Sequence, residues 1–238
     1  MLTANIPNED GENVLCNLLV PKSDMKVIDI WHVVGMKGTG SNLLQVQDAF
    51  VPDHRILEMK PWNIEGKSPG MIENTSSLYR IQLSAVMPVT LLSAILGATK
   101  GAYDFWRDNV IGKTINRSGK EVAQMTNVQI RLAKVATKIQ AAEALLKQSL
   151  NVVESGERLD YAQRVQLRCN YSYAVELCTE AIEKMFMTSG AAVAAESNPL
   201  QMYWRDIHAA SMHMAFNFDR IGEIFGKLEL DLPVAVEY

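Results

Sequence analysis

The sequence predicts a mainly α-helical protein in which a partial β-domain precedes a four-helix bundle. Two observations lead to this fold class. Apolar residues alternate or form short runs within residues 1–57, and from residue 81 onward they recur every three to four residues. We therefore expect a partial β-domain over residues 1–57, a connecting loop over residues 58–80 and a helical bundle over residues 81–238.

Two segments of the first region have strand patterns. Val14–Val20 is an apolar run of strand length, and in Leu44–Phe50 apolar residues alternate with Gln45 and Gln47. Between them lies Gly35–Ser41, a glycine-rich stretch that leads into the second strand. The prolines and glycines that follow this strand predict the connecting loop.

Four stripes of apolar residues predict the helices of the bundle. The first stripe has Pro88 in its first turn, where proline is tolerated. The second stops at Ser155 and Gly156, and the fourth is one long helix that ends at Gly226. The stripes extend over Leu91–Phe105, Val128–Val153, Leu167–Met185 and Leu200–Phe225.

The charges and cysteines exclude several classes of protein. A net charge of −4, with scattered Lys and Arg, predicts no nucleic-acid partner and no membrane-surface patch. Ile81–Thr99 carries no charge, but its polar residues favour a buried core helix over a membrane span. Cys16, Cys169 and Cys178 are an odd number without CxxC spacing, so we expect no disulfide framework, no metal site and a reducing cytoplasm.

The second and third helices also carry apolar residues outside their main stripes. Examples are Ala136, Leu145, Tyr173 and Val175. Burial on two sides is typical of helices at subunit interfaces, so we expect a homo-oligomer, a dimer or a homotetramer.

The fourth predicted helix holds the most informative polar residues. Asp206, His213 and Asn217 are seven and four residues apart, which places them on one face of a continuous helix. A histidine there can exchange a proton near neutral pH, while a neighbouring amide or carboxylate orients its ring. The alternative is a half-buried histidine with local hydrogen bonds. His208 lies on another face and is expected to be structural.

The glycine-rich stretch also has two interpretations. Its backbone N–H groups could bind a phosphate, because glycines permit close approach, or it could be a simple tight turn. Its spacing does not match GxGxxG, and a strand follows it, which argues against a dinucleotide-binding fold. Trp31, just before it, could flank a planar ligand or fill the core.

Two motifs resemble one protein superfamily. Trp31–Ser41, followed by Val46–Pro52, resembles the middle-domain signature of the acyl-CoA dehydrogenase superfamily. Pro199–His213 resembles the last bundle helix of its two-component flavin-dependent monooxygenases, which include hydroxyphenylacetate hydroxylase, secosteroid phenol hydroxylases and dibenzothiophene monooxygenase. The two motifs occur in the expected order, with a bundle of the right length between them.

The resemblance implies an activity and roles for particular residues. A separate flavin reductase would supply reduced FAD or FMN, and the enzyme would hydroxylate an aromatic or related small substrate with O2. His213 would be the acid/base residue, oriented by Asn217 or Asp206. The residues expected near the flavin or substrate are Trp31, Gly38, Thr39 and Ser41. Those expected at a flavin phosphate, across a subunit interface, are Arg117, Ser189 and Gly190.

The sequence departs from the family pattern at two places. Dehydrogenases of the superfamily often have a catalytic glutamate where this chain has His213 and Met214, and some monooxygenases have an aspartate where it has Asn217. The resemblance also starts midway through the β-domain, so we expect the N-terminal helical domain to be missing and the chain alone to be inactive. The alternatives are an acyl-CoA dehydrogenase-like dehydrogenase or oxidase, and a non-catalytic helical assembly protein.

Overall fold

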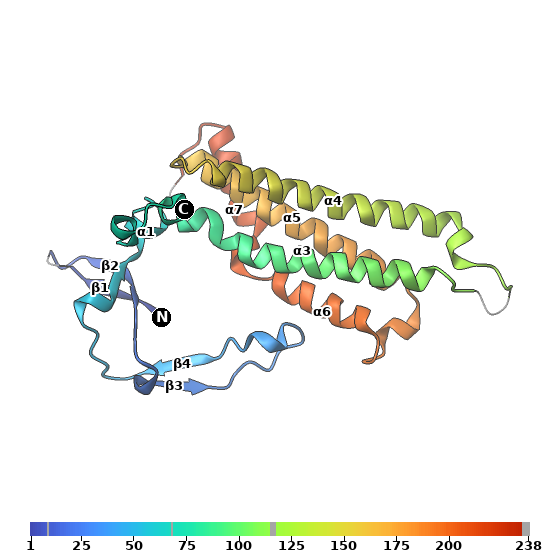
Figure 1. Cartoon of the computed structure of the whole chain (residues 1–238), viewed down its shortest axis with the longest axis horizontal. Coiled ribbons are helices and arrows are strands. Elements are labelled where there is room, and N and C mark those ends of the chain that lie inside the picture. Colours follow the sequence, from blue (N-terminus) through green and yellow to red (C-terminus); the bar gives the residue numbers. More distant parts are fainter. Residues whose placement is uncertain (9, 68, 115–117, 235–238) are drawn as a thin grey trace. The chain divides into compact units, whose positions relative to one another are not determined.

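The computed structural model describes residues 1–8, 10–67, 69–114 and 118–234 (Figure 1). The chain forms two compact units. The first contains Met1–Val33, Lys37–Ser84 and Gly156–Leu159, and the second contains Val34–Met36, Ala85–Ser155 and the chain from Asp160 onward. The first unit holds the strands and the second holds the long helices, as predicted for the fold class.

The first unit contains two antiparallel sheets. One has the strand order β1-β2-β5, with Leu18 of β2 opposite Leu2 of β1 and Ile56 of β5. The other pairs β3 with β4. The strands are β1 (Leu2–Pro7), β2 (Asn13–Leu18), β3 (Met25–Ile28), β4 (Leu43–Val46) and β5 (Ile56–Glu58).

The strand predictions are partly confirmed. The apolar run Val14–Val20 overlaps β2, which ends two residues earlier, and the second predicted strand is too long, because β4 ends at Val46. Asp48 has a φ of +52°, a left-handed conformation that cannot continue an extended strand. The sequence analysis missed β1, β3 and β5, which have at most six residues each.

Residues 58–80 are not the plain loop that we expected. They contain the short helices α1 (Met59–Asn63) and α2 (Gly70–Glu73). The buried Gln82 stabilises the end of this region, because its side-chain amide donates to the Ile64 carbonyl at 2.6 Å and to the Leu159 carbonyl at 3.1 Å. Its Oε1 accepts the Leu159 N–H at 2.8 Å, so this polar side chain is satisfied inside the unit.

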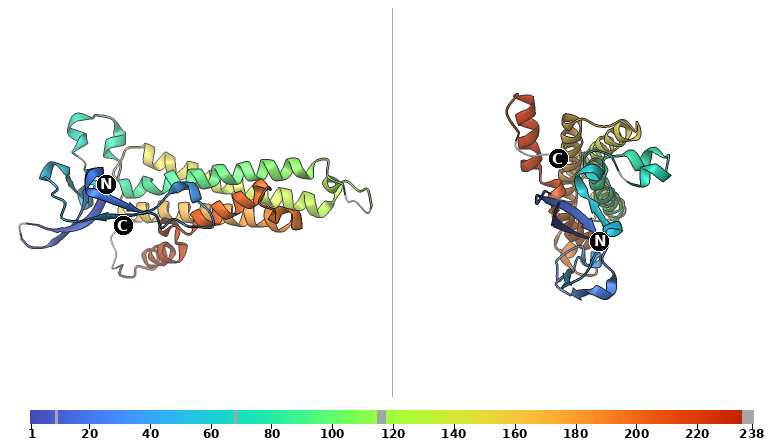
Figure 2. Two further views of the ribbon diagram at one scale, coloured as in Figure 1. Left: turned by 90° about the horizontal axis from the view of Figure 1, so that it is seen from below. Right: turned by 90° about the vertical axis from the view of Figure 1, so that its left-hand side faces the viewer.

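The second unit is the predicted bundle. Its long helices α3, α4 and α5 lie side by side, with α6 along them (Figures 1 and 2). Each buries a stripe of residues spaced three or four apart, such as Val135, Ile139, Ala142 and Leu146 in α4. The helices are α3 (Leu83–Val110), α4 (Thr126–Glu154), α5 (Tyr161–Met187) and α6 (Pro199–Ser211).

The helix ends follow from local hydrogen bonding. α4 stops at Ser155, as predicted, and Gly156 then takes a φ of +69°. α5 begins with a capping box in which Asp160 Oδ1 accepts the Gln163 N–H at 2.8 Å. α6 begins at Pro199, after the capping residue Asn198.

The proline of α3 is not where we expected it. The helix begins at Leu83, so Pro88 is in its second turn and not in its first. By length and composition α3 is also the one described helix that could cross a membrane, with 33% of its most apolar window buried. Its buried residues Leu92, Ile95, Thr99 and Ala102 follow the spacing of a bundle helix.

The single long fourth helix is the main error of the sequence-based prediction. The chain leaves α6 after Ser211, passes through the short 3-10 helix η7 (Met214–Phe216) and starts a new helix, α7 (Phe218–Glu229). The apolar stripe continues in α7 because that helix packs on α5, where Ile221 and Ile224 meet Val165 and Cys169. An apolar stripe alone therefore could not reveal the break.

Candidate active site

The connection between α6 and α7 presents His213. The residue is the N-cap of η7, and its ring Nδ1 accepts the Ala215 N–H at 3.1 Å. A nitrogen that accepts a hydrogen bond carries no proton, so the neutral ring has its proton on Nε2. The side chain is exposed. In this geometry His213 offers an N–H donor, and it can take up a proton only by releasing the Ala215 N–H.

The structure does not bring the three predicted polar residues together. Asp206 Oδ1 accepts the backbone N–H of Met36 at 2.7 Å, and Asn217 caps α7 by accepting the Arg220 N–H at 3.0 Å. The predicted common helix face is wrong because α6 ends at Ser211, before His213. The catalytic roles of the three residues stay predictions.

Two exposed methionines flank His213. The exposed fractions are 85% for Met212 and 73% for Met214, which is unusual for large apolar side chains. Flexible thioethers make favourable contacts with aromatic rings. Arg168 of α5 supports the connection, because its Nη2 donates to the Ala215 carbonyl at 3.4 Å. The connection therefore holds a polar donor between two adaptable apolar side chains.

His208 belongs to a separate network. Its Nδ1 lies 2.8 Å from the Trp204 carbonyl, and its Nε2 lies 3.5 Å from a carboxylate oxygen of Glu183. The Trp204 indole N–H donates to the same carboxylate at 2.6 Å, and the Trp204 ring stacks on Phe186. These contacts join α5 to α6.

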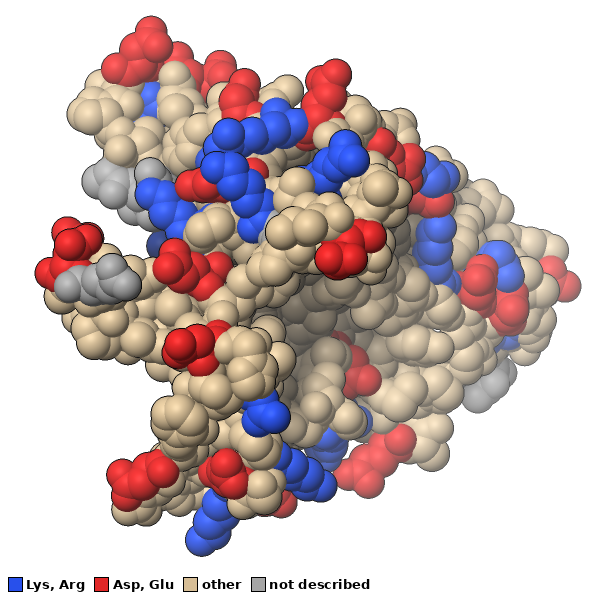
Figure 3. Space-filling model, turned by 60° about the vertical axis from the view of Figure 1, so that its left-hand side comes forward, with Lys and Arg blue, Asp and Glu red and all other residues tan. Residues whose placement is uncertain are grey.

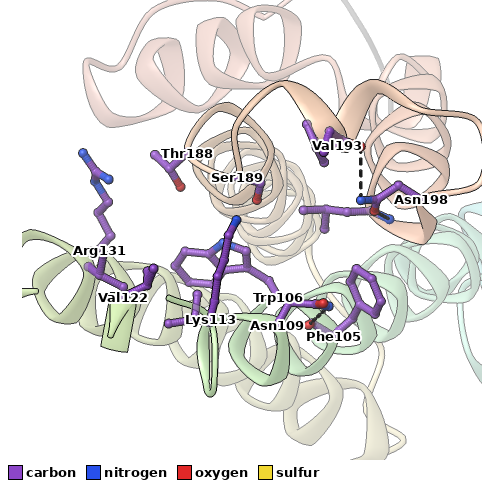
Figure 4. A pocket seen from close by; sticks show the side chains of 14 residues that line it. Phe105, Trp106, Asn109, Lys113, Val122, Arg131, Thr188, Ser189, Val193 and Asn198 are labelled. Atoms are coloured by element: carbon purple, nitrogen blue, oxygen red, sulfur yellow. Dashed lines mark hydrogen bonds between the residues drawn. The ribbon is translucent and has the colours of Figure 1, made fainter. Parts of the chain in front are cut away.

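A pocket of about 340 Å³ lies where four bundle helices end or begin (Figure 4). Its walls come from the end of α3, the start of α4, the end of α5 and the start of α6. Figure 4 shows Lys113 pointing toward Ser189, near the Trp106 ring. The polar and aromatic residues that line it include Trp106, Lys113, Arg131, Thr188, Ser189 and Asn198.

The pocket is electrically positive. Lys113 and Arg131 line it, and no carboxylate forms an ion pair with either cation in the described part of the chain. Ser189 donates to the Met185 carbonyl at 2.6 Å, so its hydroxyl caps the end of α5. Gly190 then turns the chain with a φ of +85°, which favours glycine. Two cations beside an aromatic ring suit an anionic ligand with a flat group.

The three residues predicted at a flavin phosphate differ in their relation to the pocket. Ser189 lines the pocket, Gly190 follows it, and Arg117 lies outside the described residues. Lys113 and Arg131 were missed, because a residue that follows α3 and a residue of α4 carry no common sequence signal.

The glycine-rich stretch forms the tight turn that was one of its two interpretations. Lys37–Thr39 is a 3-10 helix, Gly40 has a φ of +56°, and β4 follows. Gly38, Thr39 and Ser41 are exposed. Trp31 is partly buried, and its backbone N–H donates to Asn42 Oδ1 at 3.2 Å. Their role in cofactor binding stays a prediction.

The cysteines are not reactive groups. All three are free and buried. Burial raises the pKa of Cys178 to about 11 and also raises the pKa of Cys169. Outside the gaps at residues 9, 68, 115–117 and 235–238, the chain has no group of three or more metal-ligating side chains. Both charge signs are interspersed on the face seen in Figure 3.

Known proteins resemble the chain over almost its whole length. The oxygenase subunit HsaA of a flavin-dependent monooxygenase from Rhodococcus jostii is 33% identical over 95% of this chain and 60% of its own length. The oxygenase component of an FADH2-dependent resorcinol hydroxylase from Rhizobium sp. is 31% identical over 98% of this chain and 60% of its own. The structure of XiaF from Streptomyces sp., in complex with FADH2 and glycerol, has a TM-score of 0.87 at 30% identity and covers 98% of this chain and 60% of XiaF.

The chain therefore spans about 60% of the length of the relatives that it matches. A family model described as the C-terminal domain of acyl-CoA dehydrogenase matches residues 89–218, which is more than half of the chain and extends from within α3 to the start of α7. This protein belongs to the acyl-CoA dehydrogenase family, through its C-terminal domain.

Proposed function

We propose that the chain acts in the oxygenase component of a two-component flavin-dependent monooxygenase. It hydroxylates an aromatic substrate with O2 and with reduced FAD or FMN that a separate reductase delivers. The observation that carries the proposal is the similarity to HsaA over 95% of this chain. The resorcinol hydroxylase and XiaF, which was solved with FADH2, support the same activity.

The α6–α7 connection is proposed to bind the aromatic substrate. When bound, the reduced flavin supplies the electrons and the site of O2 activation. His213 donates a hydrogen bond from Nε2 to an oxygen that carries negative charge, such as that of a phenolate. Met212 and Met214 pack on the aromatic ring. This assignment needs no proton transfer by His213, because its Nδ1 already accepts the Ala215 N–H.

The pocket at the end of the bundle is proposed to bind the phosphate part of the flavin. Lys113 and Arg131 neutralise the phosphate charge, Ser189 can rotate its hydroxyl toward it, and Trp106 faces a flat group. A pocket of about 340 Å³ is at the small end of ligand sites, so it holds one part of the cofactor. The residues present therefore fit a phosphate-bearing cofactor.

The same pocket is proposed to serve a neighbouring copy of the chain. Large apolar side chains are exposed on the bundle helices, among them Ile130, Tyr173 and Met187. Exposed apolar surface of this kind favours self-association. Light scattering on the protein is expected to give the mass of a dimer or tetramer, and a monomer would contradict the association.

The activity can be tested on the longest natural form of the protein. It is supplied with a flavin reductase, NADH, FAD or FMN, and a panel of phenols that includes resorcinol and 4-hydroxyphenylacetate. Formation of a hydroxylated phenol supports the proposal. Reduction of the flavin by an acyl-CoA thioester, without a reductase and without hydroxylated product, would show a dehydrogenase instead.

A further inference from the structure

Three consecutive residues of the N-terminal half belong to the helical unit. Val34–Met36 group with the bundle, while the chain before Val34 and after Met36 belongs to the first unit. Two adjacent residues of α6 bind this segment. Arg205 Nη1 donates to the Val34 carbonyl at 2.7 Å, and Asp206 Oδ1 accepts the Met36 N–H at 2.7 Å.

The fit between the segment and α6 leaves no room for a side chain at Gly35. Gly35 is buried, and a Cβ there would lie 2.2 Å from the Arg205 carbonyl oxygen, far inside van der Waals contact. Only glycine lets the two backbones approach this closely. The contact is therefore specific to position 35, since a Cβ at Gly38 would meet nothing within 4 Å.

The segment is also strained. Met36 has a φ of +55°, a left-handed conformation that is uncommon for a residue with a long side chain. Strained residues persist where surrounding contacts hold them, and they are concentrated at functional sites. Here the charge-assisted hydrogen bond that the Met36 N–H donates to Asp206 holds the strained amide.

We propose that Asp206 is a positioning residue that acts through the Met36 amide. It fixes Val34–Met36 on the helix that leads directly into the His213 connection. In sequence, Trp31 lies three residues before this segment, and Gly38 lies two residues after it. The inference rests on the proposed function and on the family resemblance, which implies that Trp31 and Gly38 lie near the flavin or substrate. Asp206 thus serves the reaction without touching either reactant and without orienting His213.

Four variants of the longest natural form test this inference. Asp206→Leu removes the acceptor while keeping the side-chain size, and Asp206→Asn keeps an oxygen acceptor at the same place. Gly35→Ala pushes the segment off α6 by a steric clash. Gly97→Ala is the matched control, because a Cβ at this α3 position meets nothing within 4 Å.

Two readouts are measured for each variant, along with the unfolding temperature. The first is hydrogen exchange at the Met36 amide, which needs no flavin. The second is hydroxylated product formed per reduced flavin oxidised. We expect Asp206→Leu and Gly35→Ala to accelerate exchange about 10–100-fold and to lower the product ratio several-fold. We expect Asp206→Asn to stay within about threefold of the wild type and Gly97→Ala to match it.

In the double variant Gly35→Ala/Asp206→Leu, the Met36 exchange rate and the product ratio are expected to change no more than in the single variants, because both substitutions disrupt the same contact. If Asp206→Leu accelerates Met36 exchange but leaves the product ratio unchanged, the contact is only structural and the inference fails. If exchange does not change, the hydrogen bond itself is refuted. If the wild type makes no hydroxylated product, the proposed function fails, whatever the exchange at Met36 shows.

Discussion

The interior of α5 and the α6–α7 connection are built in opposite ways. α5 buries residues on most of its surface, and Tyr171, Ala174, Cys178 and Ile182 are fully enclosed. The connection buries Phe216 but leaves Met212, His213 and Met214 exposed, and it holds its shape through caps. Groups that contact a ligand need exposure, and a rigid scaffold keeps them in place. We therefore expect α5 to contribute most to stability, and the proposed chemistry belongs to the connection.

The sharpest test of this comparison replaces one large side chain by alanine in each region. Ile182→Ala leaves a cavity in the core and should lower the free energy of unfolding by about 2–5 kcal/mol. Met212→Ala should change it by less than about 0.5 kcal/mol, because the side chain is 85% exposed. Chemical denaturation of both variants measures the two changes. Similar losses would mean that the connection is part of the core.

The pocket is a third region, in which we expect charge, and not burial, to decide the affinity for the ligand. Arg131→Gln and Lys113→Gln should each weaken the binding of FAD about tenfold, because each removes one charged contact to a phosphate. Their unfolding temperatures should stay close to that of the wild type. Titration with FAD and with riboflavin, which has no phosphate, measures the effect. An equal loss for both ligands would place the phosphate elsewhere.

Tyr171 is one of the α5 residues that have a buried polar atom without a partner among the described residues. The Tyr171 hydroxyl is buried and has no hydrogen-bond partner among the described residues, and burial raises the pKa of Tyr171 to about 12. Tyr171→Phe should therefore be neutral or stabilise the fold by about 1 kcal/mol. A clear loss of stability would reveal a partner for the hydroxyl, such as a buried water.

The same residue predicts a dependence on alkaline pH. The ordinary pKa of tyrosine is about 10, and the folded state holds that of Tyr171 near 12. The unfolded chain loses its proton first, so stability should fall as pH rises from about 10 to 12. Tyr171→Phe should reduce this fall, as measured by denaturation at several pH values. An unchanged alkaline profile would contradict the burial of the phenol.

The smallest expected effect is on the surface of the bundle. Hydrogen bonds from Lys100 and Lys147 lower the pKa of Glu143 to about 2. This group stabilises the fold above its ordinary pKa of about 4.5, and the contribution is lost as pH falls toward 2. Glu143→Gln should slightly flatten the acid side of the stability profile, because solvent screens such pairs. A large loss of stability at neutral pH would contradict this small effect of the pairs between Glu143 and the two lysines.

The sequence predicts those parts of the molecule whose determinants are local. The stripe of α4 and its stop at Ser155 could be read directly, because helical spacing and a glycine that follows are short-range signals. The break after Ser211 could not, since α7 packs on α5 and so continues the apolar stripe of α6. The capping roles of His213 and Asn217 decide this break, and both residues were interpreted only as candidates for chemistry.

The candidate site depends on long-range contacts, so the sequence could indicate only part of it. The resemblance suggested Ser189, which lines the pocket, whereas Lys113 and Arg131 gave no signal in the sequence and meet at this pocket only in the folded bundle. The contact between Asp206 and Met36 spans 170 positions, so helical spacing led us to pair Asp206 with His213 instead. Long-range contacts of this kind have no local sequence signal.

The most direct test of the account replaces His213 and follows the product formed per reduced flavin oxidised. His213→Ser keeps a side chain that can cap η7 but removes the ring, so the fold should be retained. Hydroxylation should slow by roughly 10²–10³-fold, the usual effect of removing one donor to a developing charge, with oxygen diverted to hydrogen peroxide. His208→Ala, in the separate α5–α6 network, is the control. It should form as much product per reduced flavin oxidised as the wild type. If His213→Ser forms as much product per flavin as the wild type, His213 is only a cap and the proposed active site is wrong.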